Sequence, residues 1–252
     1  WELTQTVYAA LTVDKKEKKP IKPLWFLSYA AIIIGTFAVS LIHYPSLPEK
    51  IPMHYNIAGQ VDRYAAKSIG SILMMPIIQI IMAFMFIGIY YSILIAKNQG
   101  SGEDADESLK KGREFKAIMS KFIFFIGLGT MLIFGITQLS MLELLDISVT
   151  LAVPVIFLLL TFVLIAYLSV KVGQGGSRIG NSKRSQSKIA ANDDGKWVLG
   201  IFYYNKDDPS IFVEKRFGMG YTMNIGNPIG LIVIIAILIL IVGSLILPFV
   251  LH

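Results

Sequence analysis

The chain has 252 residues, of which 54% are hydrophobic and 16% are charged, and its formal net charge is +6. Because an average soluble domain carries about 25% charged residues, this composition excludes an ordinary soluble globular protein. Cysteine is absent, which excludes disulfide bonds, thiolate nucleophiles and cysteine-ligated metal centres.

Residues 1–24 are expected to form a cytoplasmic N-terminal segment. Since the chain begins at Trp1 rather than at a methionine, we expect it to be a fragment or a processed form. Residues 5–13 have the composition of a strand, and five lysines follow before residue 23. The first membrane span is predicted at Trp25–Tyr44, where 20 uncharged residues reach ~30 Å at ~1.5 Å per residue.

The loop at residues 45–68 combines three prolines with several turn-forming residues. Proline fixes φ and favours extended geometry in the residue before it. Gly59 permits a positive φ, and Asn56 and Asp62 can accept hydrogen bonds from backbone N–H groups. These features predict a compact loop of defined shape.

This loop also carries the motif L-P-x-x-I-P-x-H-x-N-x-x-G-x-x-D from Leu47 to Asp62, followed by Lys67-Ser68. The motif resembles that of SdpI-type bacterial membrane proteins. That family includes immunity proteins that protect a producing cell from its own secreted peptide toxin and take part in signalling to a repressor. The resemblance implies a two-helix unit at residues 25–96 with an outer loop at 45–68.

The resemblance assigns no role to single residues, so the candidates for ligand binding are chosen by their chemistry: His54, Asn56, Gly59, Asp62 and Arg63. A histidine can sense pH or donate a hydrogen bond to a ligand carbonyl. Asp62 and Arg63 can meet a charged peptide, or each other. Alternatively, the His54, Asn56 and Asp62 side chains only satisfy backbone groups within a proline-rich turn.

Three further spans are predicted before the last cytoplasmic segment. The second occupies Ile69–Ala96, a cytoplasmic loop follows at 97–114, and residues 115–172 hold spans three and four at Phe115–Leu139 and Ile147–Val172. Uncharged polar or small residues within these spans predict helix packing through hydrogen bonds and close approach; they are Gln79, Thr130, Thr137, Gln138, Gly127 and Gly135.

The segment that follows span four divides into a linker and a small β subdomain. Residues 173–192 are rich in glycine, serine and lysine, as flexible linkers are. Residues 193–227 predict a cytoplasmic β subdomain, with a hairpin between Trp197–Tyr204 and Ile211–Val213 and a third strand at Tyr221–Ile225. The stretch Gly195–Pro228 resembles a domain that accompanies the loop motif in uncharacterised membrane proteins of Gram-positive bacteria.

Basic residues in this region are candidates for contact with lipid headgroups: Arg178, Lys183, Arg184, Lys188, Lys215 and Arg216. Each lysine or arginine near an anionic membrane surface contributes ~1 kcal/mol. Phe217 and Tyr221 suit the same layer. We expect no direct nucleic-acid binding, because the linker cluster lacks interleaved aromatic residues.

The fifth span is predicted at Pro228–Leu251, so the fold class is an α-helical polytopic membrane protein with five spans and a small cytoplasmic β-sheet subdomain. Of the 23 lysines and arginines, 20 fall in alternate segments assigned to one side. Basic residues are retained on the cytoplasmic side, which places the N-terminus in the cytoplasm. The span at residues 228–252 then crosses the membrane, and the C-terminus lies outside.

No zinc-protease or nucleophile-elbow motif occurs in the sequence, and we expect a non-enzymatic protein without cofactor or metal. The leading hypothesis is an immunity or signal-sensing protein of the bacterial membrane that recognises a secreted peptide or envelope stress agent outside and communicates with a cytoplasmic regulator. The alternative is a transporter or a transporter subunit, which would require a polar path through the spans.

Overall fold

The computed structural model describes residues 18–56, 59–96, 105–173, 176, 178–179, 194–198, 202–215 and 220–236. The chain divides into two compact units, which are treated separately below. The helical unit comprises Lys22–Ile95 and Ser120–Lys171, and the second unit comprises Trp1–Ile21, Ala96–Met119 and Val172–His252. The predicted strand at residues 5–13 lies outside the described residues.

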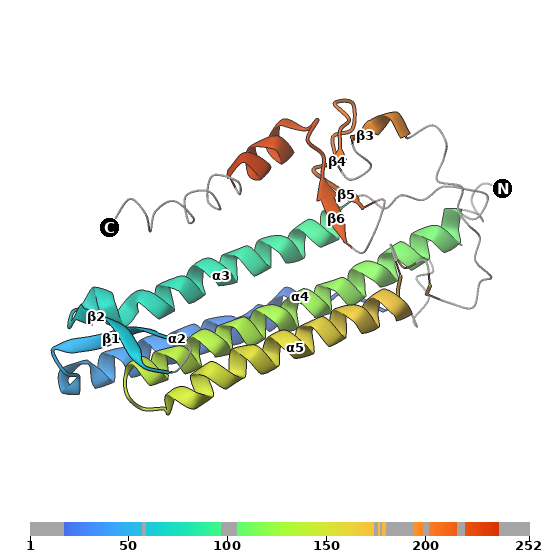
Figure 1. The fold of residues 1–252 in the computed structure, drawn as a ribbon. Helices are drawn as coiled ribbons and strands as arrows, with labels where there is room; N and C mark the ends of the chain where they lie inside the picture. The colour runs from blue at the N-terminus through green and yellow to red at the C-terminus, as the bar shows by residue number, and fades with distance from the viewer. Residues whose placement is uncertain are drawn as a thin grey trace. The chain divides into compact units, whose positions relative to one another are not determined.

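Four long apolar helices form the described membrane part of the chain (Figure 1). Each is long and apolar enough to cross a membrane: α2 (Leu27–His43), α3 (Ile69–Ile95), α4 (Ala105–Met141) and α5 (Ile147–Lys171). Short 3-10 helices, η1 (Pro23–Phe26) and η2 (Tyr44–Ser46), flank α2. The first four predicted spans are therefore confirmed as helices. The fifth is helical from residue 228 to residue 236, and its remainder lies outside the described residues.

The boundary of α4 differs from the prediction. The helix begins at Ala105, ten residues before the predicted start at Phe115, so the second half of the predicted loop at 97–114 is helical. The extension is charged and carries an ion pair between Glu107 and Lys111, one helical turn apart at 2.7 Å. Such pairs stabilise a helix without any apolar stretch, and a search for apolar spans therefore does not detect this segment.

Glycine allows α2, α3 and α4 to approach closely at one level. A Cβ on Gly127 of α4 would lie 2.1 Å from the Tyr29 hydroxyl oxygen and 2.8 Å from a Phe86 ring carbon. The Tyr29 hydroxyl is held in place because it donates a 2.7 Å hydrogen bond to the Phe124 carbonyl oxygen. Gly135, the other glycine expected to offer a small surface, has its nearest neighbour at 3.5 Å, so of these two glycines Gly127 is the one that the close approach requires.

A buried glutamine links the three helices further along. Gln79 on α3 donates from Nε2 to the Thr36 hydroxyl oxygen at 3.3 Å and to the Met131 carbonyl oxygen at 2.9 Å. Thr130 and Thr137 instead donate to carbonyl oxygens one turn back in their own helix. Gln79 thus holds separate helices together, whereas the two threonines do not.

A second glutamine compensates for a proline. Pro76 lies within α3 and has no N–H to donate to the carbonyl of Ile72, four residues earlier. Gln138 of α4, which is 1% exposed, donates from Nε2 to this carbonyl oxygen at 3.1 Å. The hydrogen bond that α3 lacks internally is thus supplied by its neighbour, as is required in the membrane interior where no water can replace it.

Within the described ranges, the β structure consists of three two-stranded antiparallel sheets. In the helical unit, β1 (Lys50–Tyr55) pairs with β2 (Val61–Ala66). In the second unit, β3 (Trp197–Val198) pairs with β4 (Phe202–Tyr203), and β5 (Phe212–Glu214) pairs with β6 (Tyr221–Met223). A single parallel bridge between Tyr203 and Asn224 joins the two pairs of the second unit.

The predicted pairing of the segment around Trp197–Tyr204 with Ile211–Val213 is wrong. The Asn224 side chain instead binds the backbone of the segment that connects them. It donates from Nδ2 to the carbonyl oxygens of Asn205 and Asp208 at 2.7 and 2.9 Å. Its Oδ1 accepts the Asn205 amide at 2.9 Å. The backbone of the expected turn is therefore tied to the end of β6, and β5 pairs with β6 rather than with β4.

Candidate functional site: the β1/β2 hairpin

The loop that carries the sequence motif is a hairpin rather than an irregular loop. Lys50 pairs with Ala66 and Tyr55 with Val61, with irregular register on both sides of His54. Pro52 lies opposite Tyr64 in this two-stranded sheet, where a missing N–H is tolerated at an outer edge. The alternation of large side chains along Lys50–Tyr55 could have indicated the strand, but the density of prolines favoured a loop.

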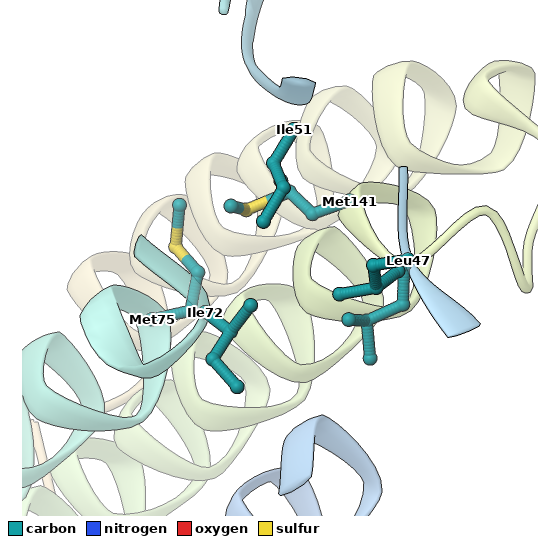
Figure 2. Close-up of a cluster of buried hydrophobic side chains, with 6 residues drawn as sticks. Leu47, Ile51, Ile72, Met75 and Met141 are labelled. Atoms are coloured by element: carbon teal, nitrogen blue, oxygen red, sulfur yellow. The ribbon is translucent and has the colours of Figure 1, made fainter. Parts of the chain in front are cut away.

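One face of the hairpin is buried against the helix ends. Ile51 is fully buried and belongs to an apolar cluster at this end of the helical unit (Figure 2); the other buried members are Leu47, Ile72, Met75, Met141 and Leu142. The cluster joins the segment after α2, strand β1, the start of α3 and the end of α4. It fixes the position of the hairpin, since burying such a side chain contributes ~1.5–3 kcal/mol.

Two of the candidate residues build the turn between β1 and β2. Asn56 Oδ1 accepts the Gln60 amide at 2.9 Å, and the Asn56 amide donates to the Gln60 carbonyl oxygen at 2.9 Å. Gly59 adopts φ +76° and donates its amide to the Asn56 carbonyl oxygen at 2.9 Å. Asn56 therefore has the structural role considered as the alternative above, and Gly59 adopts the positive φ that its residue type permits.

The two residues that end the motif also have structural roles. Lys67 Nζ donates to the carbonyl oxygens of Pro45 and Leu47 at 3.1 and 2.7 Å, and lies 5.3 Å from the centre of the Tyr44 ring. Ser68 caps α3, because its hydroxyl oxygen accepts the Ser71 amide at 3.1 Å. The partners of Lys67 could not be predicted from the sequence, since they depend on how the chain folds back on itself, whereas Ser68 is a local helix cap.

His54 and Asp62 behave differently from the rest of the motif. Their Nδ1 and Oδ1 atoms are 2.6 Å apart, and their side chains are 62% and 46% exposed. An ionised carboxylate can only accept hydrogen bonds, so Nδ1 carries the proton that is shared with Asp62. Arg63 is paired with His54 in the register and is exposed. The structure thus brings the His54 and Asp62 side chains together on the exposed part of the hairpin, and places the backbone of Arg63 opposite that of His54.

Strand β1 and the start of the neighbouring α4–α5 connection meet at Tyr55, a residue that the sequence did not single out. Tyr55 donates a 3.5 Å hydrogen bond to the Ser140 carbonyl oxygen. Burial raises the pKa of Tyr55, and the charges of Glu143 and Tyr64 raise it further. Glu143 has φ +59° at the end of α4, a conformation that favours glycine at this position. Tyr55 thus ties the hairpin to the end of α4.

The lipid candidates are only partly described. Arg178 is exposed and donates its amide to the Val172 carbonyl oxygen at 3.0 Å. Lys215 is exposed near the β5–β6 turn. Tyr221 is only partly exposed and packs against Phe115, with ring centres 6.0 Å apart. The remaining candidates lie outside the described residues: Lys183, Arg184, Lys188, Arg216 and Phe217.

No metal centre is visible among the residues that the structure describes, where no group of three or more histidines and carboxylates lies close enough to hold an ion.

Two segments of the chain are similar to known protein families. Residues 31–80 match a domain of unknown function, DUF1648, and residues 206–231 match a family of unknown function, DUF5808. The first match covers α2, the hairpin and the start of α3. The second covers the chain from the β4–β5 connection to the start of the helix at residue 228.

One curated relative supports the membrane assignment. The chain is 32% identical over 63 residues to the uncharacterized membrane protein YbgB of Bacillus subtilis (strain 168). This match covers 25% of the present chain and 63% of YbgB. No solved structure matches the chain. With four helices that can span a membrane, the chain is a multi-pass membrane protein.

Proposed function

We propose that the chain is a non-enzymatic bacterial membrane protein, similar to SdpI-type immunity and signalling proteins, that recognises a peptide or another envelope stress agent at the β1/β2 hairpin. The observation that carries this proposal is the contrast within the motif. Asn56, Gly59 and Lys67 bind the backbone of the hairpin and its surroundings, whereas His54 and Asp62 bind each other in an exposed position.

The exposed group has the chemistry to bind a peptide. With Nδ1 shared with Asp62, the other ring nitrogen of His54 is left to accept a hydrogen bond or, when the ring is protonated, to donate one. Asp62 accepts hydrogen bonds, and the Arg63 guanidinium donates up to five. A peptide backbone offers donors and acceptors in alternation. The buried cluster beneath the hairpin keeps these groups in a fixed arrangement, which lowers the entropic cost of binding.

The distribution of lysine and arginine supports an external position for the hairpin. Only Lys50, Arg63 and Lys67 are basic between the first two spans, whereas the segments before α2 and after α3 contain most of the basic residues in this part of the chain. Under the positive-inside rule the hairpin then faces the outside. A signal would reach a cytoplasmic regulator through the helices that contact the hairpin at the buried cluster.

The second candidate function is transport, and one observation favours it. Gln79 and Gln138 are 0% and 1% exposed, and the Oε1 atom of each has no hydrogen-bond partner in the described part of the chain. An unpaired buried oxygen costs ~1–3 kcal/mol. Water or a polar solute that entered between the helices would supply the missing hydrogen bond. In a transporter, these two amides would therefore line the path of the solute.

Substitution of the exposed group tests recognition. Cells that carry His54→Ala, Asp62→Ala or Arg63→Ala should lose protection against the secretions of a peptide-producing strain while the protein stays at normal abundance in the membrane. Lys50→Ala is the matched control, since Lys50 is exposed on the same hairpin and should protect fully. Lys67→Ala is the structural control and should lower abundance.

Two results would contradict the proposal. Full protection by all three alanine variants would exclude recognition through this group. If the His54 and Asp62 variants fall to the same abundance as Lys67→Ala, the pair stabilises the hairpin and does not recognise a ligand. Uptake of a solute by reconstituted vesicles that is abolished by Gln79→Leu would support transport instead.

A further inference from the structure

Strands β3 and β4 present one apolar face to the surroundings. Trp197 and Tyr203 are paired and buried, with 8% and 3% of their surface exposed. Their neighbours Val198 and Phe202 are also paired, yet are 47% and 43% exposed, and Tyr204 is 41% exposed. Because successive residues of a strand point to opposite faces, Val198, Phe202 and Tyr204 share the exposed face. We call these three side chains the β3/β4 ridge.

The first part of α4, up to Met119, belongs to the second unit. Tyr221 of β6 packs on Phe115 of α4, which is 1% exposed. Six residues further along α4, Lys121 is exposed. The helix from Lys121 to Met141 is ~30 Å long, the thickness of the hydrocarbon core. Along the helix, Phe115 lies ~9 Å before Lys121, whereas the headgroup layer is ~5–8 Å deep on each side of the hydrocarbon, so Phe115 falls at the outer edge of the headgroups.

In the sequence, an apolar helix precedes the ridge and another follows it. Span α5 ends at Lys171, and the helix that starts at residue 228 is apolar as far as it is described. The 56 residues between them, 172–227, contain eight lysines and arginines against five acidic residues. One of those acids, Asp208, is buried and accepts a hydrogen bond from the Tyr203 hydroxyl. Lys206 is exposed two residues after Tyr204.

We propose that the β3/β4 ridge lies in the headgroup layer of the membrane at this end of α4, and that the surface of the second unit prefers bilayers containing anionic lipid. Aromatic side chains are favoured at the membrane interface, and lysine next to them attracts acidic headgroups. Three side chains cannot cross the hydrocarbon core, but they can lie among the headgroups. This docking is independent of ligand recognition at the hairpin.

Site-specific fluorescence tests the proposal on the full chain, because no native cysteine competes for the label. Phe202→Cys and Asp207→Cys are each labelled with an environment-sensitive fluorophore. Asp207 is exposed in the turn after β4 and is the matched control. The proteins are reconstituted in vesicles of phosphatidylcholine alone or mixed with phosphatidylglycerol. Emission is then measured with a water-soluble quencher and, separately, with phosphatidylcholine spin-labelled near the headgroup.

The label at position 202 should emit at shorter wavelength than the label at 207, and the lipid-borne quencher should affect it more strongly, with a larger difference when phosphatidylglycerol is present. Lys206→Glu should weaken the preference for phosphatidylglycerol at least five-fold, because a single lysine near an anionic surface contributes ~1 kcal/mol and the substitution also adds a negative charge. An unchanged preference in Lys206→Glu would overturn the electrostatic part of the proposal.

Two further results would overturn the docking itself. If the water-soluble quencher reaches positions 202 and 207 equally in both kinds of vesicle, the ridge faces water. If position 202 is protected from that quencher but insensitive to the spin-labelled lipid, the ridge is covered by protein, either a second copy of the chain or another part of it.

Discussion

Lys67 shows how one side chain can hold the hairpin to the end of α2. Its ammonium group donates to two backbone carbonyl oxygens of the segment that follows α2. A hydrogen bond from a charged donor contributes ~1.5–3 kcal/mol, and here the bond to Leu47 is partly buried whereas the bond to Pro45 is exposed to water. We expect Lys67→Ala to lower the free energy of unfolding by about 2 kcal/mol, as measured by thermal unfolding in detergent. Lys50→Ala should leave it unchanged, and equal effects of the two would contradict this role.

Asp146 caps the start of α5 and makes its stability depend on pH. Hydrogen bonds from the side chain and the amide of Ser148 lower the pKa of Asp146 from its ordinary value of 3.8. A carboxyl group whose pKa is lower in the folded state stabilises that state above its unfolded pKa, and this stabilisation is lost as the pH falls through the folded value. Asp146→Ala should therefore lower the unfolding temperature at pH 7 and have a smaller effect below pH 3.8. An effect of equal size at both pH values would show that the carboxylate is not the cap.

At the scale of single residues, the sequence predicted the types of side chain involved but not their partners. Proline, glycine and asparagine indicated a shaped loop between α2 and α3, and Asn56 and Gly59 form its turn. Lys67 and Tyr55 could not be assigned, because their partners are backbone carbonyl oxygens brought near by the fold. To predict the pairing of His54 with Asp62, one must know the register of the hairpin, and the sequence alone does not determine it.

At the scale of helices, Gly127 decides how closely α2, α3 and α4 pack. A Cβ at this position would meet the Tyr29 hydroxyl, which cannot move away without losing its own hydrogen bond. Gly127→Ala should destabilise the protein by about 1–3 kcal/mol, measured by thermal unfolding in detergent. Gly135→Ala is the matched control on the same helix and should be tolerated, because its nearest neighbour is 3.5 Å away. If Gly135→Ala is as harmful as Gly127→Ala, close packing at Gly127 is not the cause.

The hydrogen bond between Gln138 and the Ile72 carbonyl can be isolated by a double-mutant cycle. Gln138→Leu removes the donor that replaces the missing N–H of Pro76. Pro76→Ala restores an amide that can donate to the same carbonyl within α3. We expect Gln138→Leu to cost about 0.6–1.7 kcal/mol more in the presence of Pro76 than in Pro76→Ala. Additive effects of the two substitutions would show that the glutamine and the proline are independent.

The helices were predicted well where they are apolar and poorly where they are not. Spans α2, α3 and α5 begin and end within a few residues of the apolar stretches. The charged start of α4 was missed because it is stabilised by pairs such as Glu107 with Lys111. The strand pairing in the second unit was mispredicted because Asn224, a single buried side chain, determines which segments meet.

At the scale of the whole molecule, the arrangement across the membrane stays a prediction. Single cysteines at Ser46 and Ser148, which are exposed at the hairpin end of the helical unit, should react with a membrane-impermeant maleimide on intact cells. A cysteine at Asp207, exposed in the second unit, should react only after the cells are opened. The reverse pattern would place the hairpin in the cytoplasm and exclude recognition of an external peptide.

The glutamine that completes α3 also imposes an order on how the protein is made. The chain is synthesised from its N-terminus, so α3 enters the membrane before Gln138 of α4 has been translated. During that interval the Ile72 carbonyl has no donor in its own helix, which costs several kcal/mol in hydrocarbon. Newly inserted α3 is therefore an incomplete element that gains stability when α4 arrives beside it. This makes the pairing of α3 with α4 a step favoured during biosynthesis, and an α3 released early is a natural target for quality control.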